Sequence, residues 1–103
     1  MAVSIATTLE ASARRLFPDM SIDQILAELL LERAQKNLIK YRALNRKFNE
    51  KYGQSFERFR QEILNSEPGS EQEQNYFDWE LAVTGIADME AEIERLGGLV
   101  QRA

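Results

Sequence analysis

The feature that most constrains this chain is an uninterrupted run from Ile22 to Tyr52 that contains neither Gly nor Pro. Ser21 precedes the run, and Gln24 stands three residues later, which is the spacing of a capping box that satisfies two orphan backbone N–H groups. Gly53 follows, as is common where a helix ends. The run therefore predicts one helix over residues 22–52, roughly 45 Å long at about 1.5 Å per residue.

Apolar residues in this predicted helix recur at steps of three or four and so fall on one face. They are Leu26, Leu30, Ala34, Leu38, Tyr41, Leu44, Phe48 and Tyr52. Four further apolar residues lie outside this stripe, namely Ile25, Leu29, Leu31 and Ile39. We expect the first half of the helix to be buried on more than one side. A small elongated domain buries little of its own surface, so we expect a homodimer to complete the core.

A second face of the predicted helix is basic. Its residues, spaced so that they fall within a narrow sector, are Arg33, Lys36, Lys40, Lys47 and Lys51. We call this set the basic strip. One interpretation is a solvated flank whose Lys stems cover the edge of the core. The others are a contact surface for an acidic helix or for phosphates, and Lys36, Lys40 and Lys47 are candidate partner contacts.

The remaining sequence predicts three further helices, at about residues 8–16, 56–65 and 71–96. Capping boxes at Thr7 with Glu10 and at Ser70 with Glu73 predict two of the starts, and Ser55 caps the third. Gly97-Gly98 predicts the last stop, with a loose tail beyond it. Val3 to Ala6 fits either a frayed first turn or a short strand.

Together these elements predict a single all-α domain over residues 1–103. Helices 22–52 and 71–96 would form an elongated antiparallel hairpin, with a short connecting helix at 56–65 and a short N-terminal helix. Residues 1–53 hold nine basic and six acidic side chains, whereas residues 54–103 hold four and eleven. Two halves of opposite charge can neutralise each other within one chain or across a dimer.

The composition argues against several classes of function. The chain contains no His and no Cys, which removes the commonest general base and the usual ligands of structural zinc. We therefore expect no catalytic residue, no metal, no cofactor and no enzymatic activity. No apolar run approaches the roughly 20 residues that span a bilayer, and no basic and apolar leader opens the chain. We expect a cytoplasmic protein that does not enter a membrane.

Three aromatic residues, Tyr76, Phe77 and Trp79, lie close together in the last predicted helix. At 100° per residue, Phe77 and Trp79 point about 160° apart, so both cannot face the same neighbouring helix. Trp79 belongs to the apolar stripe of its helix and is expected in the core. Phe77 is then the ring left for another chain, and we take all three as candidate partner contacts.

Two segments carry a resemblance to a known group of proteins. They are Phe48-Asn49-Glu50-Lys51-Tyr52-Gly53-Gln54-Ser55-Phe56-Glu57-Arg58-Phe59 and Tyr76-Phe77-Asp78-Trp79-Glu80. They resemble small helical antitoxin-like proteins of prokaryotic toxin–antitoxin modules, in which a KYG-x-SFE-x-F turn precedes an aromatic DY-x-x-WE-like helix. Asn75-Tyr76 stands where that pattern has Asp-Tyr. The resemblance implies a non-catalytic protein-binding subunit that covers a cognate toxin.

Two alternatives remain open from the sequence. One is a nucleic-acid-binding protein. Ribbon-helix-helix DNA-binding dimers have the order strand, short helix, turn and longer helix, which the N-terminal residues could follow, and the basic strip could contact phosphates. However, Val3 to Ala6 holds no basic residue and the net charge is −4, so we expect weak or no nucleic-acid binding. The other alternative is a structural helical adaptor.

Overall fold

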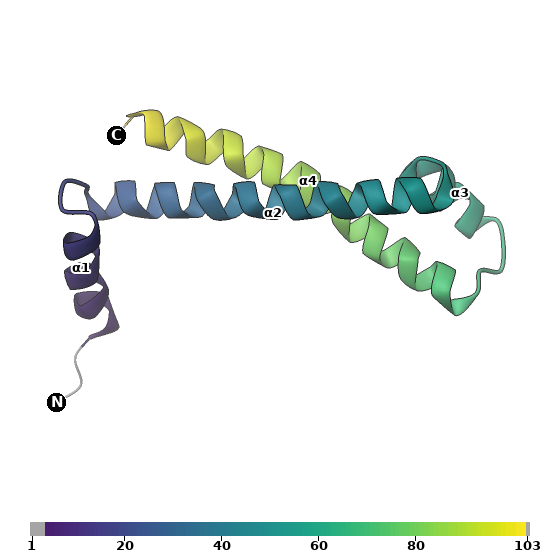
Figure 1. Cartoon of the computed structure of the whole chain (residues 1–103), viewed down its shortest axis with the longest axis horizontal. Helices are drawn as coiled ribbons and strands as arrows, with labels where there is room; N and C mark the ends of the chain where they lie inside the picture. Colours follow the sequence, from purple (N-terminus) through teal and green to yellow (C-terminus); the bar gives the residue numbers. More distant parts are fainter. Residues whose placement is uncertain (1–3, 103) are drawn as a thin grey trace.

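The computed structural model describes residues 4–102, and over this range the chain is all-α and elongated (Figure 1). The helices in order are α1 (Ile5–Leu16), α2 (Ile22–Tyr52), α3 (Phe56–Leu64) and α4 (Ser70–Arg102). The radius of gyration is 19.9 Å, whereas a compact chain of 100 residues has one of about 13 Å. The predicted fold class is confirmed.

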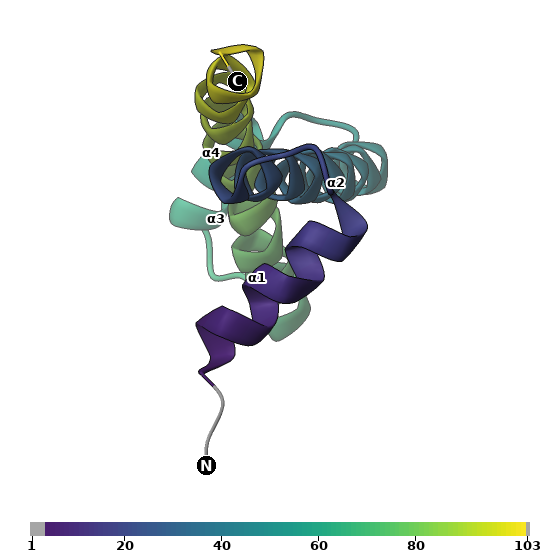
Figure 2. The same cartoon turned by 90° about the vertical axis from the view of Figure 1, so that its left-hand side faces the viewer.

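The two long helices form the frame of the molecule. α2 and α4 run in opposite directions and cross each other, so that they diverge toward both ends (Figure 1). α3 packs against α4 and α2 at the end where the chain turns back. At the opposite end, α1 contacts α2 and projects sideways from it (Figure 2). The two ends of the frame are therefore built differently.

The predicted capping box at the start of α2 is present. The Ser21 Oγ accepts a hydrogen bond from the Gln24 N–H at 3.1 Å, and the Gln24 Oε1 accepts one from the Ser21 N–H at 2.9 Å. At the other end, Gly53 adopts a left-handed conformation with φ of 62° and donates its N–H to the Asn49 carbonyl. A residue with a Cβ is strained there, which explains why Gly ends the helix.

Replacing the cap should destabilise the protein measurably. We expect Ser21→Ala to lower the free energy of unfolding by about 1 kcal/mol, because the Gln24 N–H loses its side-chain acceptor. Urea titration followed by circular dichroism measures the change. Ser66→Ala, which removes a hydroxyl bonded to the Glu62 carbonyl at the exposed end of α3, is a milder control. If Ser21→Ala lowered the free energy of unfolding no more than the control does, this role for the cap would be contradicted.

Two predicted starts are wrong in detail. α1 begins at Ile5 and not near residue 8, so Thr7 and Glu10 lie inside the helix and form no cap. Ile5 and Ala6 are therefore helical, which excludes a strand for these two residues, while Val3 lies outside the described range. In α4, Ser70 is already the first helical residue, and the Glu73 N–H donates to the Gly69 carbonyl.

The predicted end of the last helix is also wrong. α4 continues through Gly97 and Gly98 to Arg102, and neither glycine has a positive φ. A Gly within a helix costs only about 1 kcal/mol relative to Ala, and here no Pro follows to break the helix. Leu96 and Leu99 face the start of α2 beside Ala27, and these apolar neighbours favour the continued helix.

The hydrophobic core is concentrated at the end of the frame that holds α3. Phe48 of α2, Phe59 of α3 and Trp79 of α4 are buried together. Trp79 is fully buried and its ring lies within 6.0 Å of four other aromatic rings, those of Phe48, Tyr52, Phe56 and Phe59. Its indole N–H donates to the Asn45 Oδ1 at 2.7 Å, which satisfies the polar end of the ring. We call this group the aromatic core.

Gly85 lies where α2 and α4 approach closely. An added Cβ at this position would lie 2.6 Å from Cε2 of Tyr41, a distance that requires the ring to move. The neighbouring Ala82 is fully buried. These small residues of α4 allow the Tyr41 ring of α2 to pack directly on its backbone.

Candidate protein-binding surface

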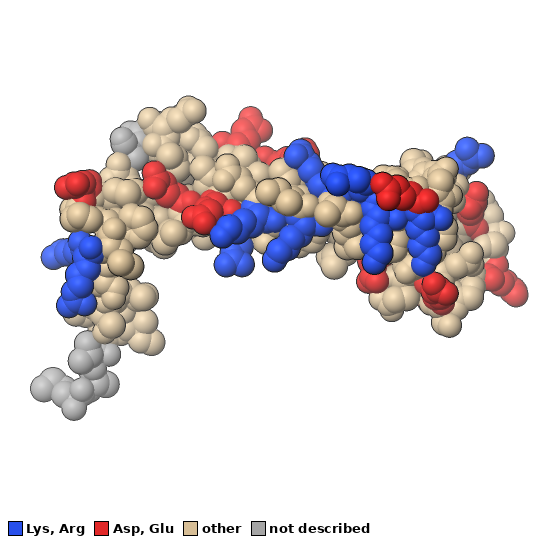
Figure 3. Space-filling view, viewed as in Figure 1, with Lys and Arg blue, Asp and Glu red and all other residues tan. Residues whose placement is uncertain are grey.

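The basic strip lies along the exposed side of α2. Arg33, Lys36, Lys40 and Lys47 are all exposed, and Figure 3 shows basic side chains gathered along this helix. Lys36 forms an ion pair with Glu32 at 3.1 Å, one helical turn away, and Lys51 forms one with Glu71 of α4 at the same distance. Exposed pairs of this kind are weak and can be exchanged for pairs with a partner.

The three aromatic residues predicted as partner contacts differ in their exposure to solvent. Phe77 is 53% exposed, as expected for the ring that faces away from α2, whereas Trp79 is fully buried. Tyr76 is half-buried, with its ring 5.7 Å from that of Phe56 and 5.5 Å from that of Phe77. Trp79 is thus a core residue that offers no surface to a partner. Tyr76 links the aromatic core to the exposed Phe77.

Phe77 has an exposed apolar neighbour on the same face of α4. Leu81 follows one turn later and is 60% exposed. Residues four apart on a helix are neighbours on its surface. The pair therefore presents a small apolar surface, which we call the outer α4 surface.

A second apolar surface lies at the opposite end of the molecule, in the half of α2 for which the sequence predicts burial on more than one side. Leu26 and Leu30, which the stripe predicts as core, are 52% and 53% exposed. They lie between α1 and α4, where the two long helices have diverged. The signal in the sequence is the excess of apolar residues around the first half of α2, which predicts burial by a second copy but not the exposure of Leu26 and Leu30 within one chain.

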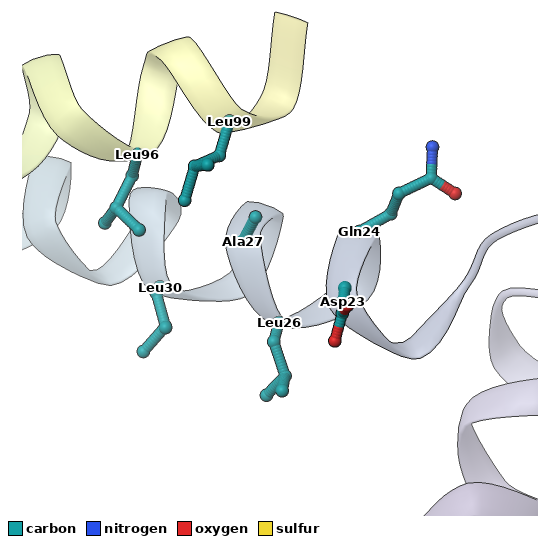
Figure 4. A pocket seen from close by; sticks show the side chains of 7 residues that line it. All are labelled: Asp23, Gln24, Leu26, Ala27, Leu30, Leu96 and Leu99. Atoms are coloured by element: carbon teal, nitrogen blue, oxygen red, sulfur yellow. The ribbon is translucent and has the colours of Figure 1, made fainter. Parts of the chain in front are cut away.

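Apolar residues over the first turns of α2 line two adjacent hollows that share Leu26. A hollow of about 400 Å³ between α1 and α2 is lined by Leu9, Leu16, Ile22 and Leu29 among others, and Leu26 also lines the next hollow. That second hollow, of about 350 Å³, is closed on its far side by Leu96 and Leu99. In Figure 4, the two α4 leucines reach toward α2, while Leu26 and Leu30 project from α2 on the side turned away from α4. We call the two hollows together the N-terminal groove.

α1 forms one wall of the N-terminal groove but buries little of its apolar surface against its own chain. None of its residues is buried, and Leu9 and Leu16 are 63% and 74% exposed. An isolated helix of this length is marginal in water and depends on packing against a neighbour. Its apolar face therefore lacks a sufficient partner within the chain.

No group of three or more acidic side chains in the described range is arranged to hold a metal ion. None of the described helices is both long enough and apolar enough to cross a bilayer.

The fold and its surfaces define a class: an elongated helical hairpin with an N-terminal helical arm and two separate exposed apolar surfaces. No protein-family model matches the chain, and neither a curated protein nor a solved structure matches it.

Proposed function

We propose that this protein is a non-catalytic protein-binding subunit. The observation that carries the proposal is that large apolar side chains lie exposed in clusters at both ends of the frame, on the outer α4 surface and in the N-terminal groove. Contiguous exposed apolar surface of this kind is typical of a protein that binds another protein. In this proposal one cluster serves self-assembly into a homodimer, and the other binds a different partner.

The resemblance of residues 48–59 and 76–80 to antitoxin-like proteins supports a finer form of the proposal. The partner would be a cognate toxin encoded by an adjacent gene, bound in the cytoplasm of a prokaryotic cell. The outer α4 surface, with Tyr76 and Phe77, would contribute apolar contact area. Lys36, Lys40 and Lys47 would attract an acidic partner over a longer range.

The proposal predicts how two sets of substitutions act on partner binding. We expect Phe77→Ala to weaken binding of the adjacent gene product by at least about 10-fold, because exposed aromatic rings are the usual anchors of interfaces. The triple change of Lys36, Lys40 and Lys47 to Glu should mainly slow association, and the difference from wild type should shrink as salt is raised. Surface plasmon resonance at two salt concentrations measures both effects.

The matched control is Leu64→Ala, since Leu64 is 66% exposed but lies on α3, outside both surfaces. All variants should keep the helical circular dichroism of the wild type. Binding that is undiminished in both the Phe77 and the triple Lys variants would exclude this surface. A partner bound only when duplex DNA is present would favour the nucleic-acid alternative instead.

A further inference from the structure

We infer that the N-terminal groove is covered by α1 of a second copy of this chain, so that the α1 helices of the two copies pack against each other over both grooves across a twofold axis. The inference rests on the proposed homodimer and specifies its surface. Neither the outer α4 surface nor the basic strip takes part, so both remain free for a different partner.

The first argument is that the groove and the helix that fits it are both present in one chain. The groove needs an apolar helix to cover Leu26, Leu30, Leu96 and Leu99. α1 offers such a helix, because Leu9 and Leu16 lie on one face and remain largely exposed. Within the described residues, α1 contacts α2 but not α4, so its own apolar face does not close the groove.

The second argument is charge complementarity. The last turn of α1 carries Arg14 and Arg15, both exposed, and its one carboxylate, Glu10, lies one turn earlier. The start of α2 is purely acidic: residues 19–32 contain four Asp or Glu and no Lys or Arg, and Asp23 lines the groove. An α1 helix entering from a second copy would thus bring two positive charges to a negative rim, which fixes orientation as well as aiding association.

The third argument is symmetry. A twofold dimer uses the same surface on both chains, so each copy contributes one arm and one groove. Each of the two grooves in the dimer is then covered once, by α1 of the other copy. A different protein would have to supply a helix of matching length and charge. A second copy of this chain already has such a helix in its α1.

The test uses analytical ultracentrifugation of the full chain across a range of concentrations. We expect a dimer for the wild type at micromolar concentration. Leu9→Gln with Leu16→Gln, and separately Leu26→Gln with Leu30→Gln, should each weaken the dimer by at least about 100-fold, because four apolar side chains per dimer lose their burial. Gln keeps the helix propensity high, so both variants should stay folded.

The matched control pair is Leu64→Gln with Leu81→Gln, which are equally exposed leucines outside the groove. The control should dimerise like the wild type. The fluorescence of Trp79, the single Trp of the chain, should be unchanged in all variants because it reports the aromatic core at the other end.

Cross-linking then identifies the surface directly, since the natural chain has no Cys. Copies with Ser12→Cys in α1 are mixed with copies of a different size that carry Gly98→Cys in α4, and a short bis-maleimide reagent is added. A cross-link between the two kinds of chain supports the position of α1 over the groove of the other copy.

A wild-type dimer that the groove variants leave intact, or that gives no mixed cross-link, would overturn this surface while leaving the homodimer in place. A wild-type monomer would overturn both the surface and the homodimer, but not binding of a different partner at Phe77.

Discussion

Trp79→Ala should lower the free energy of unfolding by about 3–5 kcal/mol, the range observed when a buried aromatic ring is replaced by Ala. Trp79 is fully buried and contacts rings from both other helices of the aromatic core. The change also removes the donor that pairs with the Asn45 side chain. Because whole domains are stable by only about 5–15 kcal/mol, we expect the variant to be marginally folded.

Phe77→Ala is the matched control, since it removes an aromatic ring only two residues away on the same helix. Phe77 is 53% exposed, and substitutions at exposed positions usually change stability by about 0.5 kcal/mol or less. Thermal melts followed by circular dichroism, at one fixed protein concentration, compare the two variants. Similar losses for both would show that the aromatic core is not centred on Trp79.

Gly85→Ala is expected to destabilise the protein by up to about 2 kcal/mol, although Ala is the better helix former by about 1 kcal/mol. The reason is the Tyr41 ring, which lies 2.6 Å from the position of the added Cβ and must move. Forcing an extra methyl group into a packed contact typically costs about 1–3 kcal/mol. The clash therefore outweighs the gain in helix propensity.

Two companion variants separate these effects. Gly98→Ala adds the same methyl group to the same helix where no atom lies within 4 Å, and it should stabilise by up to about 1 kcal/mol. Combining Gly85→Ala with Tyr41→Leu should cost less than the sum of the two single changes, because the ring that clashes is gone. A stabilising Gly85→Ala would contradict the close contact. A destabilising Gly98→Ala would contradict the continuation of α4 through the two glycines.

Local signals predict much of the fold. The bounds of α2 follow from the Ser21 cap and from Gly53, and the structure shows both in the expected geometry. The burial of Trp79 and the exposure of Phe77 follow from their angular separation on one helix. Periodicity and end signals are local, so a single sequence is enough to locate them.

Features that depend on the path of the helices are predicted less well. The stripe of α2 correctly places Leu38 and Phe48 in the core but not Leu26 and Leu30. All four have the same periodicity; the difference arises because α4 crosses α2 and diverges from it, so that α4 lies beside Ala27 but leaves Leu26 and Leu30 exposed (Figure 1). In the sequence, Gly97 and Gly98 likewise resemble the end of a helix. In the structure, Leu99 lies beside Ala27, and this apolar neighbour favours continuation of the helix past them. A sequence pattern shows that a face needs a neighbour but not where that neighbour lies.

We propose that the two ends of the molecule differ: the aromatic core is stable within one chain, whereas α1 and the start of α2 depend on a second chain. Hydrogen–deuterium exchange at several protein concentrations tests this most directly. We expect amides around Phe48, Phe59 and Trp79 to be protected at every concentration. Amides of α1 should exchange rapidly at nanomolar concentration and become protected as the dimer forms. Protection of α1 that is equally strong at all concentrations, or absent at all of them, would contradict the account.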